Sequence, residues 1–152
     1  MRKILVLFIL TMMAIQPTFA ASWVEIGNWQ FIDKDSVKRY VNDKGRTEFR
    51  KKTFWRKDAD TNQDYMMSIE QLCHKKIGYI IAQEIIDYKK NKVASKTIIV
   101  YDGDSNIITN IENEDASLEW QDILPNSIGE KWYNLVKSPR TLKKMYKAQT
   151  QK

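Results

Sequence analysis

Hydrophobic and polar positions alternate along much of the chain between residues 22 and 101, in runs separated by turn residues. The runs cover residues 22–27, 29–33, 46–55, 65–74, 77–88 and 93–101. A period of two with short connections, such as the Asp- and Gly-containing turn at 42–45, is typical of β-strands joined as hairpins. The pattern therefore predicts a single antiparallel sheet of about six strands, and residues 65–74 are one of them.

The pattern changes after residue 102. Residues 103–118 are polar and acidic and predict a loop with at most fragments of strand. Ser127 and Glu130 then have the spacing of a capping box at a helix start. The apolar face of that helix consists of Ile128, Trp132, Leu135 and Val136. A second, basic helix is predicted over 139–148, where the apolar stripe consists of Leu142, Met145 and Tyr146. The fold class is therefore α+β, with the sheet packed against a C-terminal helix.

Residues 1–20 have the pattern of a secretory signal peptide. Arg2 and Lys3 precede an apolar run, and the small residues Thr18 and Ala20 precede the expected cleavage point. The run of about 12 apolar residues is too short to span a bilayer, which needs roughly 20, so no transmembrane segment is expected after cleavage. No cysteine lies near the junction to accept a lipid. We expect a periplasmic or secreted protein with one domain at 21–137 and a basic C-terminal extension at 138–152.

The only cysteine and the only histidine, Cys73 and His74, are neighbours. On a strand they would point to opposite faces, which excludes the contact of about 3 Å that a thiolate–imidazole pair needs. We therefore expect a structural thiol and an exposed histidine. A single cysteine in an oxidising compartment is buried, paired between molecules, or left over from a lost bridge.

Two Asp-rich runs, residues 58–64 and 102–106, begin like calcium-binding loops. Neither has the glycine at position 6 or the glutamate at position 12 that an EF-hand needs, and ordinary turns explain them better. The sequence contains no phosphate-binding glycine loop, nucleophile elbow or zinc ligand set. We expect no enzymatic activity, no metal and no cofactor.

Basic residues are the stronger indication of function. The net charge of +6 falls to +4 when Arg2 and Lys3 leave with the signal peptide, which favours weak attraction to anionic surfaces without identifying a partner. The candidate residues for binding an anionic ligand are Arg50, Lys52, Arg140, Lys143, Lys144 and Lys147. Such contacts weaken with salt. The alternative is a solvated face diluted by Glu48 and Glu70; no nucleic-acid partner is expected.

Several segments, in this order, resemble the bacterial surface-adhesin protein E family. They are WVEIG at 23–27, FIDKDSV at 31–37, a charged strand ending near Trp55, Cys73, and WQDILPNSIGE at 120–130. The likeness covers roughly residues 21–136. It implies about six antiparallel strands packed against a C-terminal helix. It also implies a binding role without catalytic residues, because the named member of the family is an adhesin that engages host matrix proteins.

The chain departs from this family in two respects. Relatives usually have a second cysteine at the end of the helix, where this chain has Lys137, so the resemblance implies that Cys73 is the remaining half of a structural bridge. The lipid acceptor is also missing, and an unanchored adhesin needs another means of retention.

The sequence thus predicts an exported, adhesin-like, non-enzymatic binding protein that engages host matrix proteins or an anionic polysaccharide. The alternative is a periplasmic structural or inhibitor-like protein that docks to another envelope component or to a second copy. The run at 77–88 supports this alternative because both of its faces are apolar, and one helix covers only one face. These faces are Tyr79, Ile81 and Ile85 on one side, and Ile80, Ala82 and Ile86 on the other.

Overall fold

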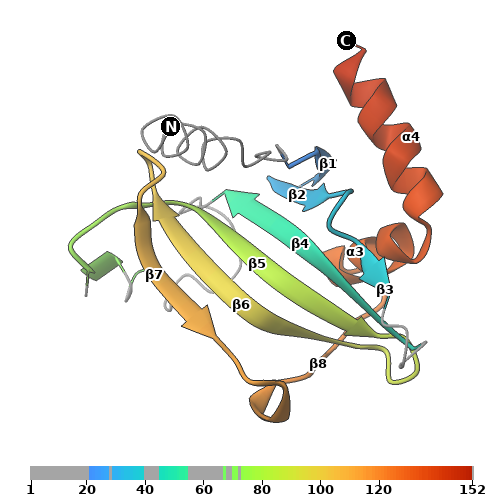
Figure 1. Ribbon diagram of the computed structural model, residues 1–152, viewed down its shortest axis with the longest axis horizontal. Helices are drawn as coiled ribbons and strands as arrows, with labels where there is room; N and C mark the ends of the chain where they lie inside the picture. The colour runs from blue at the N-terminus through green and yellow to red at the C-terminus, as the bar shows by residue number, and fades with distance from the viewer. Residues whose placement is uncertain are drawn as a thin grey trace, which may run out of the picture.

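The computed structural model describes residues 21–27, 29–39, 45–54, 67, 70–71 and 73–151. The predicted signal peptide, most of the 42–45 turn and the acidic run at 58–64 lie outside these residues. The described chain forms an open antiparallel sheet with two helices gathered at one end (Figure 1). Neither of these helices is long and apolar enough to cross a membrane.

The sheet has eight strands in the part of the chain that is described. They are β1 (Trp23–Gly27), β2 (Gln30–Asp33), β3 (Lys38–Arg39), β4 (Arg46–Phe54), β5 (Ile77–Asp87), β6 (Lys92–Asp102), β7 (Ile107–Glu112) and β8 (Gln121–Asp122). The order is β1-β2-β4-β5-β6-β7, with β3 paired to β4 and β8 to β6, and all these pairs are antiparallel. The predicted antiparallel sheet is confirmed, with eight strands instead of about six.

The strand predicted at 65–74 is wrong. The described residues of this segment, Met67, Glu70, Gln71 and Cys73, are helical, and a turn follows at His74. Met, Glu and Gln favour helix over strand, and a short apolar run does not separate the two by periodicity alone. The preference of the individual residues therefore outweighs the apparent alternation.

The segment predicted as a loop, residues 103–118, contains strand β7 and a short 3₁₀ helix, η1 (Asp115–Ser117). β7 extends the sheet beyond β6, and its register places Ile111 opposite Ile98 and Thr109 opposite Val100. The β-branched residues of β7 favour strand. Its polar residues obscured the pattern because an edge strand has one side open to water.

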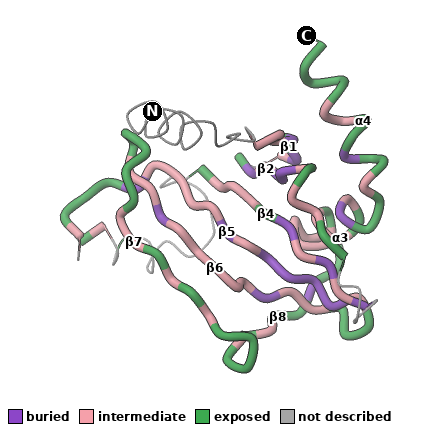
Figure 2. Tube along the Cα trace, in the orientation of Figure 1, coloured by how far each residue is buried: buried purple, intermediate pink, exposed green. Residues whose placement is uncertain are grey.

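Both helices lie against one face of the sheet, which we call the covered face. They are α3 (Ile128–Lys137) and α4 (Pro139–Thr150). The buried core under them consists of Val24, Ile26, Ile32, Phe49, Ile86, Ile123, Val136 and Leu142. Figure 2 shows this burial concentrated where the helices meet the strands. The predicted apolar faces of both helices are confirmed because all their residues pack in this cluster.

A second, smaller cluster lies near the start of β5. Its buried residues are Ile77 and Val100, and the half-buried residues around them are Cys73, Ile80, Ile98 and Ile108. Between the two clusters, the buried carboxylate of Glu84 accepts from Ser95 Oγ at 2.8 Å and pairs with Lys51 Nζ at 2.6 Å. This polar group is fully satisfied within the fold and divides the apolar packing of the sheet.

Candidate binding surfaces

The outward side of α4 carries four basic residues, which we call the basic face of α4. They are Arg140, Lys143, Lys144 and Lys147, and all are exposed. Their spacing of i, i+3, i+4 and i+7 places them on one side of a helix. The opposite side carries Leu142, which is completely buried in the core. Figure 2 shows α4 at the margin of the molecule, exposed along most of its length.

Contacts on its inner side fix the orientation of α4. The Gln149 side chain pairs with the backbone of Glu25 at the edge of the sheet, donating to its carbonyl at 2.9 Å and accepting from its amide at 3.1 Å. The Lys34 ammonium lies 4.7 Å from the centre of the Tyr146 ring. Pro139 at the helix start has the fixed φ that a first helical turn needs. The helix therefore presents its basic face in one direction.

The cations of the basic face form no ion pair with a carboxylate among the described residues. None of its four residues forms an ion pair or a side-chain hydrogen bond with another described residue, and α4 contains no acidic residue. The acidic residue Asp35 lies close enough to feel the charge of Lys143. A hydrogen bond from Lys34 is the main cause that lowers the pKa of Asp35, and Lys143 adds to it. Like charges at i+3 and i+4 destabilise a helix by about 0.2–0.5 kcal/mol per pair.

Arg50 and Lys52 are separated from the basic face of α4. In β4, Phe49 precedes Arg50 and belongs to the core, and Lys51, between Arg50 and Lys52, has its Nζ 4.0 Å from the centre of the Trp132 ring. Strand alternation therefore directs Arg50 and Lys52 to the other, uncovered sheet face. The structure brings four of the six predicted anion-binding residues together and places the other two elsewhere.

Arg50 and Lys52 both have partners within the fold. The Arg50 guanidinium pairs with the carboxylate of Asp33, which is completely buried and also accepts the amides of Ser22 and Asp35. The Lys52 ammonium lies 3.9 Å from the centre of the Tyr79 ring and 4.6 Å from that of Phe54. These cations contribute to the fold, and their charge is already partly compensated.

An aromatic row crosses the uncovered sheet face, from β2 through β4 and β5 to β6. It consists of Phe31, Phe54, Tyr79 and Tyr101, with successive ring centres 5.6, 5.8 and 4.6 Å apart. The register causes it, because Tyr79 pairs with both Phe54 and Tyr101. Trp29, Phe54 and Ile107, which are 52%, 38% and 58% exposed, lie at this end of the sheet. Sequence reasoning missed this row, since the only signal was one aromatic residue in each of four strands.

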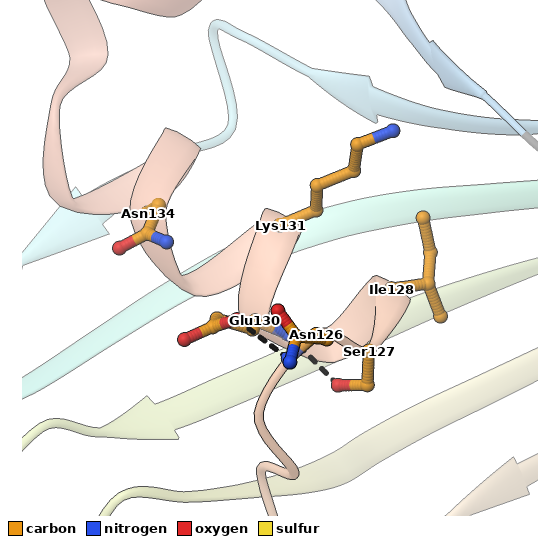
Figure 3. Close-up of a pocket in the computed structure, with 6 residues that line it drawn as sticks. All are labelled: Asn126, Ser127, Ile128, Glu130, Lys131 and Asn134. Carbon is orange, nitrogen blue, oxygen red and sulfur yellow. Dashed lines mark hydrogen bonds between the residues drawn. The ribbon is translucent and has the colours of Figure 1, made fainter.

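A shallow pocket lies at the start of α3 (Figure 3). Its lining residues are Asn126, Ser127, Ile128, Glu130, Lys131 and Asn134. Ser127 Oγ accepts the Glu130 amide at 3.2 Å, and Glu130 Oε2 accepts the Asn126 amide at 2.8 Å. The predicted capping box is thus present, although Glu130 reaches Asn126 instead of Ser127. Its polar groups satisfy the helix start, and Glu130 and Lys131 bring opposite charges, so the pocket has no excess of positive charge for an anion.

Cys73 and His74 lie in different surroundings. Cys73 is half-buried in the second cluster, and His74 is exposed in a turn with a φ of 50°. The reason given by the sequence, opposite faces of a strand, is wrong because Cys73 is helical. No group of three His, Cys, Asp or Glu side chains suited to a metal ion occurs among the described residues.

Cys73 and Lys137 lie at opposite ends of the sheet. Cys73 packs beside Ile77, where β5 begins, whereas Lys137 Nζ is 6.0 Å from the ring centre of Tyr88, which follows the end of β5. The 11 residues of β5 separate these ends by roughly 30 Å, far more than the Cα separation of about 7 Å that a disulfide permits. The interpretation of Cys73 as half of a bridge to position 137 is therefore wrong.

The Asp-rich run at 102–106 is a turn, as expected. Asp102 Oδ1 accepts the amides of Asp104 at 3.0 Å and Asn106 at 2.8 Å. The hydrogen bond from the Asn106 amide is the main cause that lowers the pKa of Asp102. These bonds close the β6–β7 connection.

An open antiparallel sheet with helices on one face defines a mixed α+β fold. Two solved structures of Haemophilus influenzae protein E share it. The first, crystal form II, has a TM-score of 0.52 and 7% identity and covers 76% of this chain and 86% of that chain. The second, from a non-typeable strain, has a TM-score of 0.50 and 8% identity, and the match covers 89% of this chain and 92% of that chain. No protein-family model and no curated protein matches the sequence. The chain therefore has a protein E-like fold, and the likeness extends to the fold alone.

Proposed function

We propose that this protein is an exported, non-enzymatic binding protein that engages its partner through the basic face of α4. The observation that carries the proposal is that four exposed cations on one side of a docked helix form no ion pair with any residue that the structure describes. Those cations repel one another and contribute no contact to the core, so they lower the stability of the helix. An anionic partner would offset this loss.

The proposed role is adhesin-like, with host matrix proteins or an anionic polysaccharide as partners. The protein E-like fold is compatible with it, and the resemblance of the sequence to the surface-adhesin protein E family points in the same direction. Export rests on the signal-peptide pattern of residues 1–20. In the absence of a lipid acceptor, contact with an anionic surface would also help to retain the protein outside the cell.

The test is a binding assay with residues 21–152 on immobilised matrix proteins and on heparin, at physiological salt. One variant replaces the basic face with glutamine, and a control with the same loss of charge replaces Lys75, Lys76, Lys90 and Lys96. We expect the first variant to lose binding and the control to retain it. Equal binding by both variants, or no binding by the unaltered protein, would contradict the proposal.

The aromatic row favours a second candidate function. In this reading a periplasmic structural or inhibitor-like protein docks to another envelope component through the uncovered sheet face. Clustered exposed apolar residues such as Phe54 and Ile107 mark interaction surfaces. Replacing both with serine would then abolish cross-linking to a periplasmic partner in cells, while neutralising α4 would leave it unchanged. If the serine variant still cross-linked and the α4 variant did not, this second candidate function would be contradicted.

A further inference from the structure

We infer that the partner of the basic face is a linear sulfated polysaccharide that lies along α4 and continues towards β3. This inference rests on the proposed function and names the class of its ligand.

The basic surface extends beyond the start of α4. Lys137 and Arg39 are both exposed, and Arg39 Nη2 donates to the Lys137 carbonyl at 3.0 Å. Figure 1 shows β3 beside the corner where α3 ends and α4 begins. Lys38, which precedes Arg39 in β3, is paired with Glu48 and points to the opposite face. The basic face therefore meets a basic corner consisting of Arg39 and Lys137.

The charges lie in a row along the helix and do not converge on one point. At 1.5 Å per residue, Arg140 and Lys147 are separated by about 10 Å along the helix axis. A single small anion would contact only one or two of these side chains. A flexible chain with repeated anionic groups matches a row of cations and gains from each contact in turn.

A bilayer fits α4 less well than a soluble polymer. Helices that bind membrane surfaces insert an apolar side into the lipid. The apolar side of α4 is occupied, because Leu142 is completely buried and Met145 and Tyr146 pack against the same core. Only the charged side remains for a partner.

Nucleic acid also fits less well. Proteins that hold single strands combine cations with aromatic rings on which bases stack. The outward side of α4 has no aromatic residue, and Lys34 lies over the ring of Tyr146.

The close spacing of the cations favours a densely charged chain. Four cations lie within about 10 Å along the helix axis, and sulfate esters give each sugar more negative charge than a uronate carboxylate alone. We therefore expect sulfate esters to determine the affinity more than uronate carboxylates.

The inference is tested by titrating residues 21–152 with heparin oligosaccharides from two to eight sugars, at several salt concentrations. Affinity should rise with length, and a de-sulfated octasaccharide should bind at least roughly tenfold more weakly. The slope of log affinity against log salt should fall by roughly one for each cation replaced. Replacing Arg39 and Lys137 with glutamine should lower the affinity for the octasaccharide about threefold or more. The affinity for the disaccharide should not change.

Two further variants and two further probes are needed. Replacing the basic face with glutamine should lower the affinity for the octasaccharide roughly tenfold or more. A variant that combines Lys143→Arg, Lys144→Arg and Lys147→Arg should bind the octasaccharide with unchanged affinity. Tighter binding to phosphatidylglycerol vesicles or to single-stranded DNA than to the sulfated octasaccharide would overturn the inference. Equal affinity for the sulfated and the de-sulfated octasaccharide would also overturn it. Matrix-protein binding that requires α4 without any polysaccharide binding would overturn this inference alone and leave the proposed function standing.

Discussion

The basic face of α4 and the uncovered sheet face both place cations at the surface, but they differ in how these cations are compensated. Arg50 pairs with the buried Asp33, and Lys52 lies over two aromatic rings. The cations of α4 have neither kind of partner among the described residues. Exposure alone therefore does not mark a binding residue. The difference lies in whether the fold already uses the charge.

The largest expected effect concerns the inner side of α4. Leu142→Ala removes a completely buried side chain from the core and should lower the free energy of unfolding by about 2–5 kcal/mol. Lys144→Ala, on the outer side of the same helix, should change it by less than about 0.5 kcal/mol. Urea denaturation measures both. If Leu142→Ala cost under about 1 kcal/mol, α4 would not be firmly docked and its basic face would have no fixed direction.

The same substitution at two arginines should affect stability differently on the two surfaces. Arg50→Gln leaves the buried carboxylate of Asp33 without its charged partner and should cost about 1–3 kcal/mol of unfolding free energy. Arg140→Gln should be neutral in the same urea experiment, because Arg140 has no ion-pair or hydrogen-bond partner among the described residues. Similar costs at both positions would contradict the contrast between the two surfaces.

Acid titration should reveal a structural carboxylate at the end of β5. Burial raises the pKa of Asp87, but the amides of Lys90 and Lys89 and the Arg46 side chain together lower it below the ordinary 3.8. A lowered pKa stabilises the fold above the unfolded-state value, and this stability is lost as the pH falls through the folded-state pKa. Asp87→Asn should therefore lose about 1 kcal/mol at pH 7 and show a flatter pH dependence below about pH 4. Unchanged pH dependence in urea unfolding would contradict this role.

The smallest effect has the opposite sign. Replacing the four residues of the basic face with glutamine removes like-charge neighbours and should raise the free energy of unfolding by a few tenths to about 1 kcal/mol. The gain should shrink in high salt, because salt screens exposed charges. A clear loss of stability at low salt would mean that these residues serve the fold, and the reason for assigning them to a partner would disappear.

Local patterns predicted much of this fold. The run of β-branched and aromatic residues at 77–88 and the capping box at Ser127 and Glu130 were sufficient for β5 and for the start of α3, because both signals act within a few residues. The spacing within α4 also placed Arg140, Lys143, Lys144 and Lys147 on one side. These four candidate residues were accessible from sequence because helical geometry alone brings them together.

Features that depend on contacts between distant residues were not predicted. The aromatic row exists only because the registers of β4, β5 and β6 align Phe54, Tyr79 and Tyr101. The pairing of Arg50 with Asp33, and the distance between Cys73 and Lys137, depend on the arrangement of the strands. A polar edge strand such as β7 is stabilised by its neighbour, so its own sequence showed too weak an alternation to reveal it.

Backbone amide shifts, recorded by NMR while a sulfated octasaccharide is titrated into residues 21–152, test directly where the partner binds. The account predicts saturable shifts in α4 and near Arg39 and Lys137, with the amides of Phe54, Tyr79 and Tyr101 unchanged. Shifts concentrated on the uncovered sheet face, with α4 unaffected, would contradict it.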